Sequence, residues 1–467
     1  MITKQFFKNK RITVFGLGLN GGGVAVVKFL AKYGAKEIIV TDIKKRSELL
    51  SSIALLKSVK NVTYVLGQHR PEDFTRVDMV IANPGIAWTN EYIKLALKKN
   101  IPVEMDASIF FQLCSQPIIG VTGTKGKTTT STLLAEILKV AGHHVVSVGI
   151  GQVPVLNALD DLKAKSVVVF ELSSWRLSSL AYIKKSPHIA IFTNIFPDHF
   201  NYYKSMAGYM KDKKNIFAFQ TKKDSLIINE DNEAVVEAAS LCPAHMIGFS
   251  EHSEIKRDGV FVDGDTIISK VGQEQKTIML LSDIKMRGAH NISNILAAIA
   301  GAMTYGVDIK TIRKAIMNFS GVEHRLEFVR EKNGVKYYND TAATVPEAAC
   351  MALRSFVEPI VLIAGGNNKG LDFTSLGEAI AQYAKDVVFF KGEATEKIIK
   401  YLRKHLSESD SDTVYTIVES MEDAVRSASE KAEKGDVVVL SPGATSFGLF
   451  RNEFDRGEQF RAVVKKL

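Results

Sequence analysis

Along this chain, short apolar runs alternate with longer stretches in which apolar residues recur at helical spacing. Short apolar runs bounded by turn residues are typical of buried strands, whereas recurrence about every 3.6 residues is typical of an amphipathic helix. The first block opens with an apolar run at 11–15, a glycine-rich turn and a helical pattern over 23–33. Further apolar runs follow at 37–41 and 79–82, so the pattern predicts strands that alternate with helices.

The same alternation restarts twice more. In the second block the predicted strands are 118–121, 166–170 and 189–193, followed by short strands with glycine turns over 225–277 and a helix over 291–305. The third block begins near Val322, and its predicted strands are 335–338, 360–364, 387–390 and 437–440. Strands that alternate with helices in every block predict an α/β fold throughout.

A chain of 467 residues is long enough for about three domains, which agrees with the three blocks. Its hydrophobic content of 46% is ample for packed cores. We therefore predict three α/β domains, over 1–112, 113–321 and 322–467.

Charge and cysteine content exclude several classes of protein. The formal net charge is +9, but the 60 lysines and arginines are spread along the chain and form no basic run interleaved with aromatic residues. This distribution disfavours nucleic acid as a partner and suits small anionic substrates. Three widely spaced cysteines form neither a disulfide framework nor a zinc pattern, and no run reaches the roughly 18 apolar residues of a membrane helix. We expect a cytoplasmic protein without membrane insertion.

The strongest chemical signal is a glycine-rich loop between an apolar run and a helical pattern. The loop reads Gly123-x-x-Gly126-Lys127-Thr128, a shorter form than the usual nucleotide-triphosphatase loop, which would need glycine at Val121. Backbone N–H groups of such a loop and the following helix N-terminus bind phosphate, the lysine reaches the terminal phosphates and the threonine hydroxyl binds Mg²⁺. A plain glycine turn with an exposed lysine is the alternative, but strand, loop and helix all agree. The sequence therefore predicts ATP binding.

The N-terminal block carries a weaker nucleotide signal. Gly16, Gly18 and Gly21 match the Gly-x-Gly-x-x-Gly spacing of a Rossmann-like turn, and Asp42 follows at the distance where a ribose hydroxyl is held. Asn83 opens a tight turn at the end of the predicted strand 79–82, where ligands bind in open sheets.

Two polar residues follow predicted strands of the second block. Glu171 ends the strand 166–170, and His199 follows the strand 189–193. Both are expected beside the phosphate loop, where they would face a bound Mg²⁺. A carboxylate suits Mg²⁺ well, whereas imidazole is a less usual ligand, and a lone histidine is more often a core or surface residue.

A series of motifs along the chain resembles the Mur ligase family, from about residue 10 to the C-terminus. In order, these are Thr122-Gly-Thr-Lys-Gly-Lys-Thr128, Glu171-Leu-Ser-Ser174, Asn194-x-x-x-Asp198-His199, Gly288-Ala-His-Asn-Ile-Ser-Asn294, His324-Arg325-Leu-Glu327, Asn339-Asp340-Thr-Ala-Ala-Thr344, Gly365-Gly-Asn-Asn-Lys369-Gly-Leu-Asp372-Phe373 and Leu440-Ser-Pro-Gly-Ala-Thr-Ser446. Any one of these motifs can arise by chance, but the whole series in this order is specific.

The resemblance implies an ADP-forming carbon–nitrogen ligase of peptidoglycan precursor synthesis. The motifs are most similar to those of the members that add D-glutamate to UDP-N-acetylmuramoyl-L-alanine through an acyl phosphate. The same resemblance implies a Rossmann-like N-terminal domain that binds the UDP-sugar and a central P-loop ATPase-like domain with a parallel sheet that binds ATP with Mg²⁺. A Rossmann-like C-terminal domain would bind the amino acid. A monomer that uses ATP, two Mg²⁺ ions and a carbamylated lysine is expected.

The resemblance also assigns roles to individual residues. Lys127, Glu171, His199 and Lys213 would be catalytic, with Lys213 carbamylated; Lys211 and Lys214 are near enough that a one-residue shift in the match would change that choice. The metal ligands would be Thr128, Glu171, His199 and Lys213. The ATP contacts would be Gly123, Thr124, Lys125, Gly126, Lys127, Thr128, Thr129, Asn291, Asn294, Arg325 and Asp340. The UDP-sugar contacts would be Gly18, Leu19, Asn20, Gly21, Asp42 and Asn83, and the amino-acid contacts Thr344, Lys369, Ser446 and Phe454.

Two positions depart from the pattern of the D-glutamate-adding members. Ala342 stands where a lysine is common, and Ile150 stands where a loop usually carries a substrate-contacting asparagine. Both lie on the substrate side, so they leave open a different amino acid or stereoisomer, such as L-glutamate.

Three other functions compete with this prediction. A folylpolyglutamate synthase-like ligase would lack the Rossmann-like segment in front of the phosphate loop. A nicotinamide-binding oxidoreductase would leave the motifs around Glu171, His199 and Lys369 without a role. A nucleotide-binding scaffold without activity would have no need to retain Lys127 and these residues.

Overall fold

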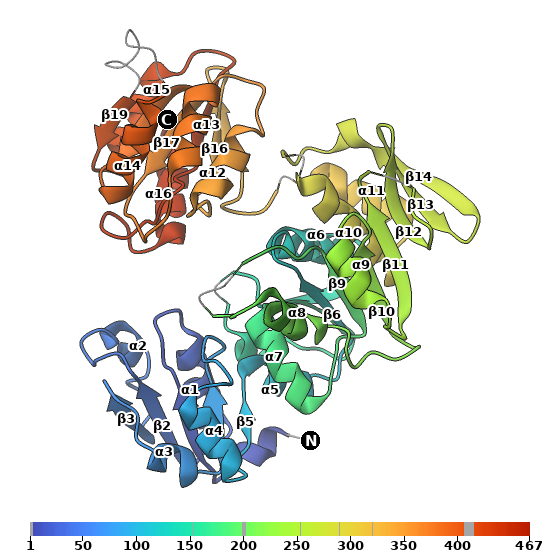
Figure 1. Ribbon diagram of the computed structural model, residues 1–467, viewed down its shortest axis with the longest axis vertical. Helices are drawn as coiled ribbons and strands as arrows, with labels where there is room; N and C mark the ends of the chain where they lie inside the picture. Colours follow the sequence, from blue (N-terminus) through green and yellow to red (C-terminus); the bar gives the residue numbers. More distant parts are fainter. Residues whose placement is uncertain are drawn as a thin grey trace. The chain divides into compact units, whose positions relative to one another are not determined.

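The computed structural model describes residues 3–151, 153–198, 202–252, 254–288, 290–319, 321–405 and 415–467. These residues form three β-sheets, each packed against helices (Figure 1). The chain divides into two compact units, Met1–Leu281 with Ser293–Ile316, and Ser282–Ile292 with Met317–Leu467. The N-terminal and central sheets both belong to the first unit. The predicted domain boundaries at 112/113 and 321/322 stay predictions.

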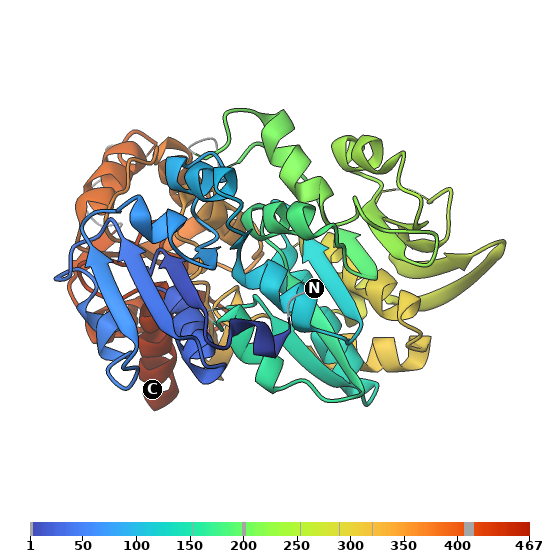
Figure 2. The same cartoon turned by 90° about the horizontal axis from the view of Figure 1, so that it is seen from below.

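The N-terminal sheet is parallel, with the strand order β3-β2-β1-β4-β5. Its strands lie side by side in blue in Figure 2. They are β1 (Arg11–Phe15), β2 (Glu37–Asp42), β3 (Val62–Leu66), β4 (Met79–Ala82) and β5 (Val103–Glu104), and the helices are α1 (Gly22–Lys32), α2 (Leu50–Ala54), α3 (Glu72–Thr75), α4 (Glu91–Lys98) and α5 (Asp106–Leu113). Successive strands leave β1 in opposite directions, so a ligand-binding crevice is expected between β1 and β4.

The central sheet has the order β14-β13-β12-β11-β10-β9-β6-β8-β7. It is parallel from β12 to β7, as predicted, and β13 and β14 extend it in antiparallel fashion at one edge. Its strands are β6 (Ile118–Thr122), β7 (His144–Val148), β8 (Ser166–Glu171), β9 (Ile189–Phe192), β10 (Ser225–Asn229), β11 (His245–Ser250), β12 (Gly259–Asp263), β13 (Thr266–Val271) and β14 (Glu274–Leu280). Its helices are α6 (Lys127–Val140), α7 (Ser174–Ile183), α8 (Met206–Lys214), α9 (Glu233–Ala239), α10 (His290–Thr304) and α11 (Ile309–Asn318).

The C-terminal sheet has the order β15-β16-β20-β17-β18-β19, and all neighbouring pairs are parallel except β15 with β16. Its strands are β15 (Glu327–Lys332), β16 (Val335–Asn339), β17 (Ile360–Gly365), β18 (Ala384–Phe390), β19 (Tyr415–Val418) and β20 (Val437–Leu440). Its helices are α12 (Pro346–Leu353), α13 (Thr374–Tyr383), α14 (Glu393–Leu402), α15 (Met421–Lys431) and α16 (Glu453–Lys466).

Side-chain alternation explains why helices cover both faces of the C-terminal sheet. In β17, Leu362 packs into one core with helices α12, α13 and α14, whereas Ile363 packs into the other with α15 and α16. Because successive side chains of a strand point to opposite faces, a strand buried on both sides must be apolar throughout. The all-apolar run of β20 has this property, and all four of its residues are buried. Among the described residues, no helix combines the length and apolarity needed to cross a membrane.

Candidate active site

The phosphate loop joins the buried strand β6 to helix α6, as predicted. Gly126 precedes the helix with a φ of +83°, a conformation that L side chains rarely adopt, and an added Cβ there would collide with Asn294. A Cβ at Gly123 would collide with Thr193 in the same way. The two glycines are therefore required by sterics, and they let the chain turn tightly so that the N–H groups at the start of α6 face the loop. Such a loop is a cradle for an anion.

Residues 194–196, which follow β9, form hydrogen bonds with this loop. The N–H of Thr124 donates to the Asn194 carbonyl at 3.0 Å, and the N–H of Lys125 donates to the Asn194 side-chain oxygen at 2.9 Å. In return, the N–H of Phe196 donates to the Thr124 hydroxyl at 3.0 Å. These bonds hold the loop in one shape before any ligand arrives, which lowers the entropy lost on binding.

Lys127 lies over the loop. Its Nζ donates to the carbonyls of Gly123 and Thr124, both at 3.0 Å, so its charge is held beside the anion cradle. Thr128 is partly buried and Thr129 is 8% exposed, both in the first turn of α6. This placement agrees with a lysine and hydroxyl that serve a bound phosphate.

Lys213 is the most unusual group near the loop. It is 1% exposed, and its Nζ donates to the Gly123 carbonyl at 2.7 Å and lies 4.9 Å from the centroid of the Tyr209 ring. Burial, and then the nearby Lys127, lower the pKa of Lys213 well below its usual range, although Asp198 and Glu171 oppose the shift. Burial of this kind favours the neutral amine over the charged ammonium. The neighbouring lysines of α8 differ from it in burial, since Lys211 is exposed and Lys214 is partly buried.

Glu171 ends strand β8, beside Val121 of the strand that leads into the loop. Its Oε2 is buried and has no hydrogen-bond partner among the residues that the structure describes. A buried carboxylate oxygen without a donor is costly unless a cation binds it. With the Thr128 hydroxyl it offers oxygen ligands of the kind that Mg²⁺ prefers, so these residues fit the expected ion. His199 lies outside the described residues.

The first glycine loop, Gly16–Gly21, follows β1. It lies beside the carboxyl ends of β2 and β4. The N–H of Gly18 donates to Asp42 Oδ2 at 3.0 Å, and the N–H of Lys44 donates to Asp42 Oδ1 at 2.9 Å. Asn83 lies beside the loop, because a Cβ on Gly18 would be 3.6 Å from its Nδ2. The structure thus brings Gly18, Asp42 and Asn83 together at the expected crevice. Both Asp42 oxygens accept backbone N–H groups, so this residue shapes the loop.

Other predicted residues of this loop differ in exposure. Leu19 and Asn20 are exposed, and Gly21 caps helix α1 with a φ of +80°. Sequence reasoning missed Gly23: a Cβ there would collide with the Leu17 carbonyl, so this glycine is what permits close packing of α1. Its place in a run of three glycines was the available signal.

The site residues predicted in the C-terminal domain lie in the loops that follow β16, β17 and β20. Asp340 accepts from the Ser441 hydroxyl at 2.7 Å and from the Leu326 N–H at 3.1 Å, and burial raises its pKa to about 7. Lys369 is exposed in the loop after β17. Ser446 is 4% exposed, and its Oγ is buried without a hydrogen-bond partner within the described ranges. A buried hydroxyl of this kind is a candidate to bind a ligand.

The remaining predicted residues of this unit are also placed. Thr344 is partly buried after β16, Arg325 is exposed, and the Phe454 ring packs edge-on against His324 at 5.6 Å between centroids. Two predicted ATP contacts lie on α10: Asn294 beside Gly126, and Asn291, whose Nδ2 donates to the Arg287 carbonyl at 2.6 Å.

Arg456 was missed by sequence reasoning. Its guanidinium is fully buried and donates to the Thr341 carbonyl at 2.9 Å, the Thr341 hydroxyl at 3.0 Å and the Ala444 carbonyl at 3.3 Å. Burial lowers its pKa to about 9. Arg456 thereby ties the loop after β16 to the loop after β20. A charged residue in a polar helix gave no signal of this role.

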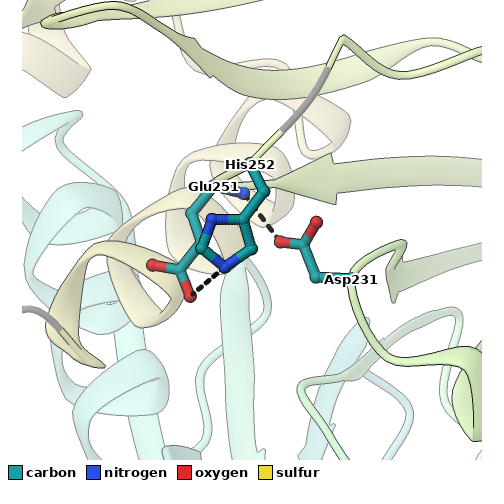
Figure 3. A group of neighbouring side chains, drawn as sticks. All are labelled: Asp231, Glu251 and His252. Carbon is teal, nitrogen blue, oxygen red and sulfur yellow. Dashed lines mark hydrogen bonds and ion pairs between the residues drawn. The ribbon is translucent and has the colours of Figure 1, made fainter.

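Asp231, Glu251 and His252 lie close together on the loops after β10 and β11 (Figure 3). Asp231 already accepts hydrogen bonds on both oxygens, from the Ser250 hydroxyl at 2.6 Å and from the Glu251 N–H at 2.7 Å. Exposed acidic groups with satisfied oxygens are common in proteins without a metal, so we do not count this group as a site.

Comparison with known proteins agrees with these features. The family model for the Mur ligase middle domain matches residues 121–302, that for the Mur ligase glutamate ligase domain matches 324–443, and that for the MurD-like N-terminal domain matches 10–104. A protein of Roseiflexus sp. (strain RS-1), named UDP-N-acetylmuramoylalanine--D-glutamate ligase, is 42% identical over 98% of each chain. The chain belongs to the Mur ligase family.

Other Mur ligases agree with this membership. A relative of the same name from Acetivibrio thermocellus is 35% identical over 99% of this chain and 98% of its own. Among solved structures, the UDP-N-acetylmuramate-alanine ligase MurC of Thermotoga maritima superposes with a TM-score of 0.60 at 18% identity, covering 98% of this chain and 99% of its own. MurF of Acinetobacter baumannii has the same TM-score at 15% identity, covering 100% and 93%. The predicted three-domain α/β fold of a Mur ligase is confirmed.

Proposed function

We propose that this protein joins D-glutamate to UDP-N-acetylmuramoyl-L-alanine with ATP, in the synthesis of peptidoglycan precursors. The observation that carries the proposal is the full-length identity of 42% to a relative named for this reaction. The MurD-like N-terminal match over 10–104 favours it over a folylpolyglutamate synthase-like ligase. Such a reaction suits a cytoplasmic monomer, because its substrates are small and soluble and the two end sheets can serve different substrates within one chain.

The reaction has two steps. A carboxylate oxygen of the L-alanyl group attacks the γ-phosphorus of ATP, and ADP leaves, which gives an acyl phosphate. The amine of D-glutamate then attacks the acyl carbon, loses a proton and displaces phosphate, so that a C–N bond replaces the C–O bond. Phosphorylation is needed because a free carboxylate is a poor electrophile. The protein contributes positioning and neutralisation of the phosphate charge.

The central residues take the ATP side of this reaction. We assign the phosphates to the loop Gly123–Gly126 with Lys127, Thr128 and Thr129, which the pre-formed N–H cradle supports. Asn291, Asn294, Arg325 and Asp340 are assigned to the rest of the nucleotide. Two Mg²⁺ ions are assigned to Thr128, Glu171, His199 and carbamylated Lys213, and the unpartnered Glu171 oxygen and the buried amine support this assignment. Bound Mg²⁺ supplies charge neutralisation at the transferred phosphoryl group.

The end domains take the other two substrates. We assign the UDP-sugar to the domain 1–112, through Gly18, Leu19, Asn20, Gly21, Asp42 and Asn83. The convergence of the Gly18 loop, Asp42 and Asn83 at the switch point between β1 and β4 supports this. ATP and Mg²⁺ belong to 113–321, and the amino acid to 322–467, through Thr344, Lys369, Ser446 and Phe454.

The direct test is phosphate release with UDP-N-acetylmuramoyl-L-alanine, ATP, Mg²⁺ and a panel of D- and L-amino acids. We expect D-glutamate to give the highest kcat/KM. A preference for L-glutamate or another amino acid would refute the stereochemical part and would point to Ala342 and Ile150 as its cause. Absence of phosphate release with every amino acid would refute ligation.

We expect Lys369→Ala to raise the KM for glutamate far more than the KM for ATP. Glutamate brings two carboxylates, and removing the Lys369 charge leaves one of them without its ionic partner, which costs more than losing a neutral hydrogen bond. Thr344→Ala should do the same more weakly. Steady-state kinetics with each substrate varied in turn measures both effects.

The matched control is Lys397→Ala, an exposed lysine on α14 of the same unit, which should behave as wild type. An unchanged glutamate KM in Lys369→Ala, or equal changes in both lysine variants, would contradict this pocket.

A further inference from the structure

The segment between β4 and α4 is a rigid double turn that touches the first glycine loop. The N–H of Ile86 donates to the Asn83 carbonyl and the N–H of Asn90 to the Ala87 carbonyl, both at 2.9 Å, and the Asn90 side chain caps α4. A Cβ built on Gly16 would lie 3.0 Å from Asn83 Cβ and 3.2 Å from Ile86 Cδ1, so this segment packs directly beneath the loop. Movement of the segment would therefore move the loop.

Trp88 is the second residue of the second turn, 87–90, and contacts helix α7 of the central sheet. Its Nε1 donates to the Ser178 hydroxyl at 2.8 Å, and its ring stacks on Tyr182 with centroids 3.8 Å apart and planes 22° apart. The Ser178 hydroxyl in turn donates to the Trp175 carbonyl at 2.6 Å, so its hydrogen and a lone pair are both used. A satisfied hydrogen bond together with an aromatic stack fixes both the direction and the distance of the contact.

Helix α7 is the element that follows Glu171. It begins at Ser174, and Ser173 caps it by accepting from the Arg176 N–H at 3.3 Å. The contact through Trp88 thus connects the segment under the first glycine loop to the helix that continues from the proposed metal ligand. Two ion pairs also join residues 3–113 to the central part of the chain, Arg176 with Asp106 and Lys32 with Asp160, and neither of these two involves the segment under the loop.

We propose that Trp88 is a positioning residue. It fixes the distance between the first glycine loop and the phosphate loop, and thereby where the carboxylate of a bound UDP-sugar substrate lies. This inference rests on the proposed function. The nucleotide end of that substrate is assigned to the first glycine loop, whereas its carboxylate must meet the γ-phosphate near Lys127. One long substrate must span both places, so the reactive geometry depends on how firmly the two sheets are joined. A misplacement of about 1 Å can lower a rate about 100-fold.

The test is Trp88→Ala in the full-length protein. We expect kcat for phosphate release with UDP-N-acetylmuramoyl-L-alanine to fall about 10- to 100-fold, while the KM for ATP stays within about twofold. The dissociation constant of the UDP-sugar, measured by calorimetry without ATP, should change by less than about threefold, because its nucleotide contacts lie on the N-terminal sheet. Tyr182→Ala should show a smaller fall in kcat, and the matched control Tyr182→Phe, which keeps the ring, should equal wild type.

An unchanged kcat in Trp88→Ala would overturn the proposal. Parallel losses of ATP affinity, UDP-sugar affinity and melting temperature would also overturn it, because they would indicate general destabilisation.

A second measurement needs no turnover, so it separates this inference from the proposed function. The chain has two tryptophans, so in Trp175→Phe the emission comes from Trp88. Titration with UDP should change that emission, because the Trp88 segment packs under the glycine loop. An emission that does not respond to bound UDP would refute the link between loop and helix, whether or not the protein ligates glutamate.

Discussion

Lys127→Ala will reduce ATP-dependent ligation to below about 1% of wild type while the fold stays intact. The Lys127 ammonium is held over the phosphate loop by the Gly123 and Thr124 carbonyls, 3.0 Å from each. As charge develops on the transferred phosphoryl group, this fixed cation stabilises it, and loss of such a group typically raises the barrier by about 3 to 4 kcal/mol. Phosphate release under saturating ATP measures the effect, and far-ultraviolet circular dichroism checks the fold.

The matched control for this prediction is Lys139→Ala, on the last turn of the same helix. Lys139 forms a surface ion pair with Glu136, 3.7 Å between Nζ and Oε2, which contributes little to stability. We expect wild-type turnover from it. Near-normal turnover in Lys127→Ala would contradict the assignment of the phosphate loop.

Lys213→Ala will lose most of the activity, and a short carboxylic acid such as formate or acetate will restore part of it. The amine is buried, and burial lowers its pKa, which favours the neutral form that reacts with CO₂. The resulting carbamate carries a negative charge that bound Mg²⁺ would stabilise. Removing the side chain opens space beside Gly123 for a free carboxylate in its place.

Mass spectrometry under native conditions should detect one bound CO₂ on the wild-type protein and none on Lys213→Ala. Lys211→Ala serves as the control, because Lys211 lies on the same helix but is exposed. Full activity in Lys213→Ala with loss of activity in Lys211→Ala or Lys214→Ala would show that the carbamylated position is assigned to the wrong lysine.

Local patterns were enough to predict most of the fold. The strand 79–82 was predicted at the bounds that β4 has, and a helix follows the phosphate loop as predicted. Apolar runs, glycine spacing and turn residues act over a few neighbours along the chain, so they can be interpreted without knowing what packs against them. The predicted parallel central sheet did not include the antiparallel pairs β12–β13 and β13–β14, although two-residue turns that begin at Gly264 and Gly272 join these strands and gave a local signal for hairpins.

The sequence predicted the part of the candidate site that lies within one continuous segment. The loop Gly123–Lys127 combines strand, turn and helix within a few residues, and its geometry follows from the two glycines whose added Cβ atoms would collide with neighbours. The sequence alone could not choose among Lys211, Lys213 and Lys214, because all three are basic residues of one polar helix. Only the packing of α8 against the loop buries Lys213 and lowers its pKa.

The sequence by itself determined the α/β class, the phosphate loop and the order of the family motifs, since these depend on residues that are close along the chain. Tertiary structure decided that Asp42 accepts hydrogen bonds from the first glycine loop and that Arg456 connects the loops after β16 and β20. It also decided that Trp88 donates a hydrogen bond to Ser178 of α7. Trp88 and Ser178 are 90 residues apart in sequence. Contacts of that kind form only when separate elements pack, and no local periodicity or spacing encodes them.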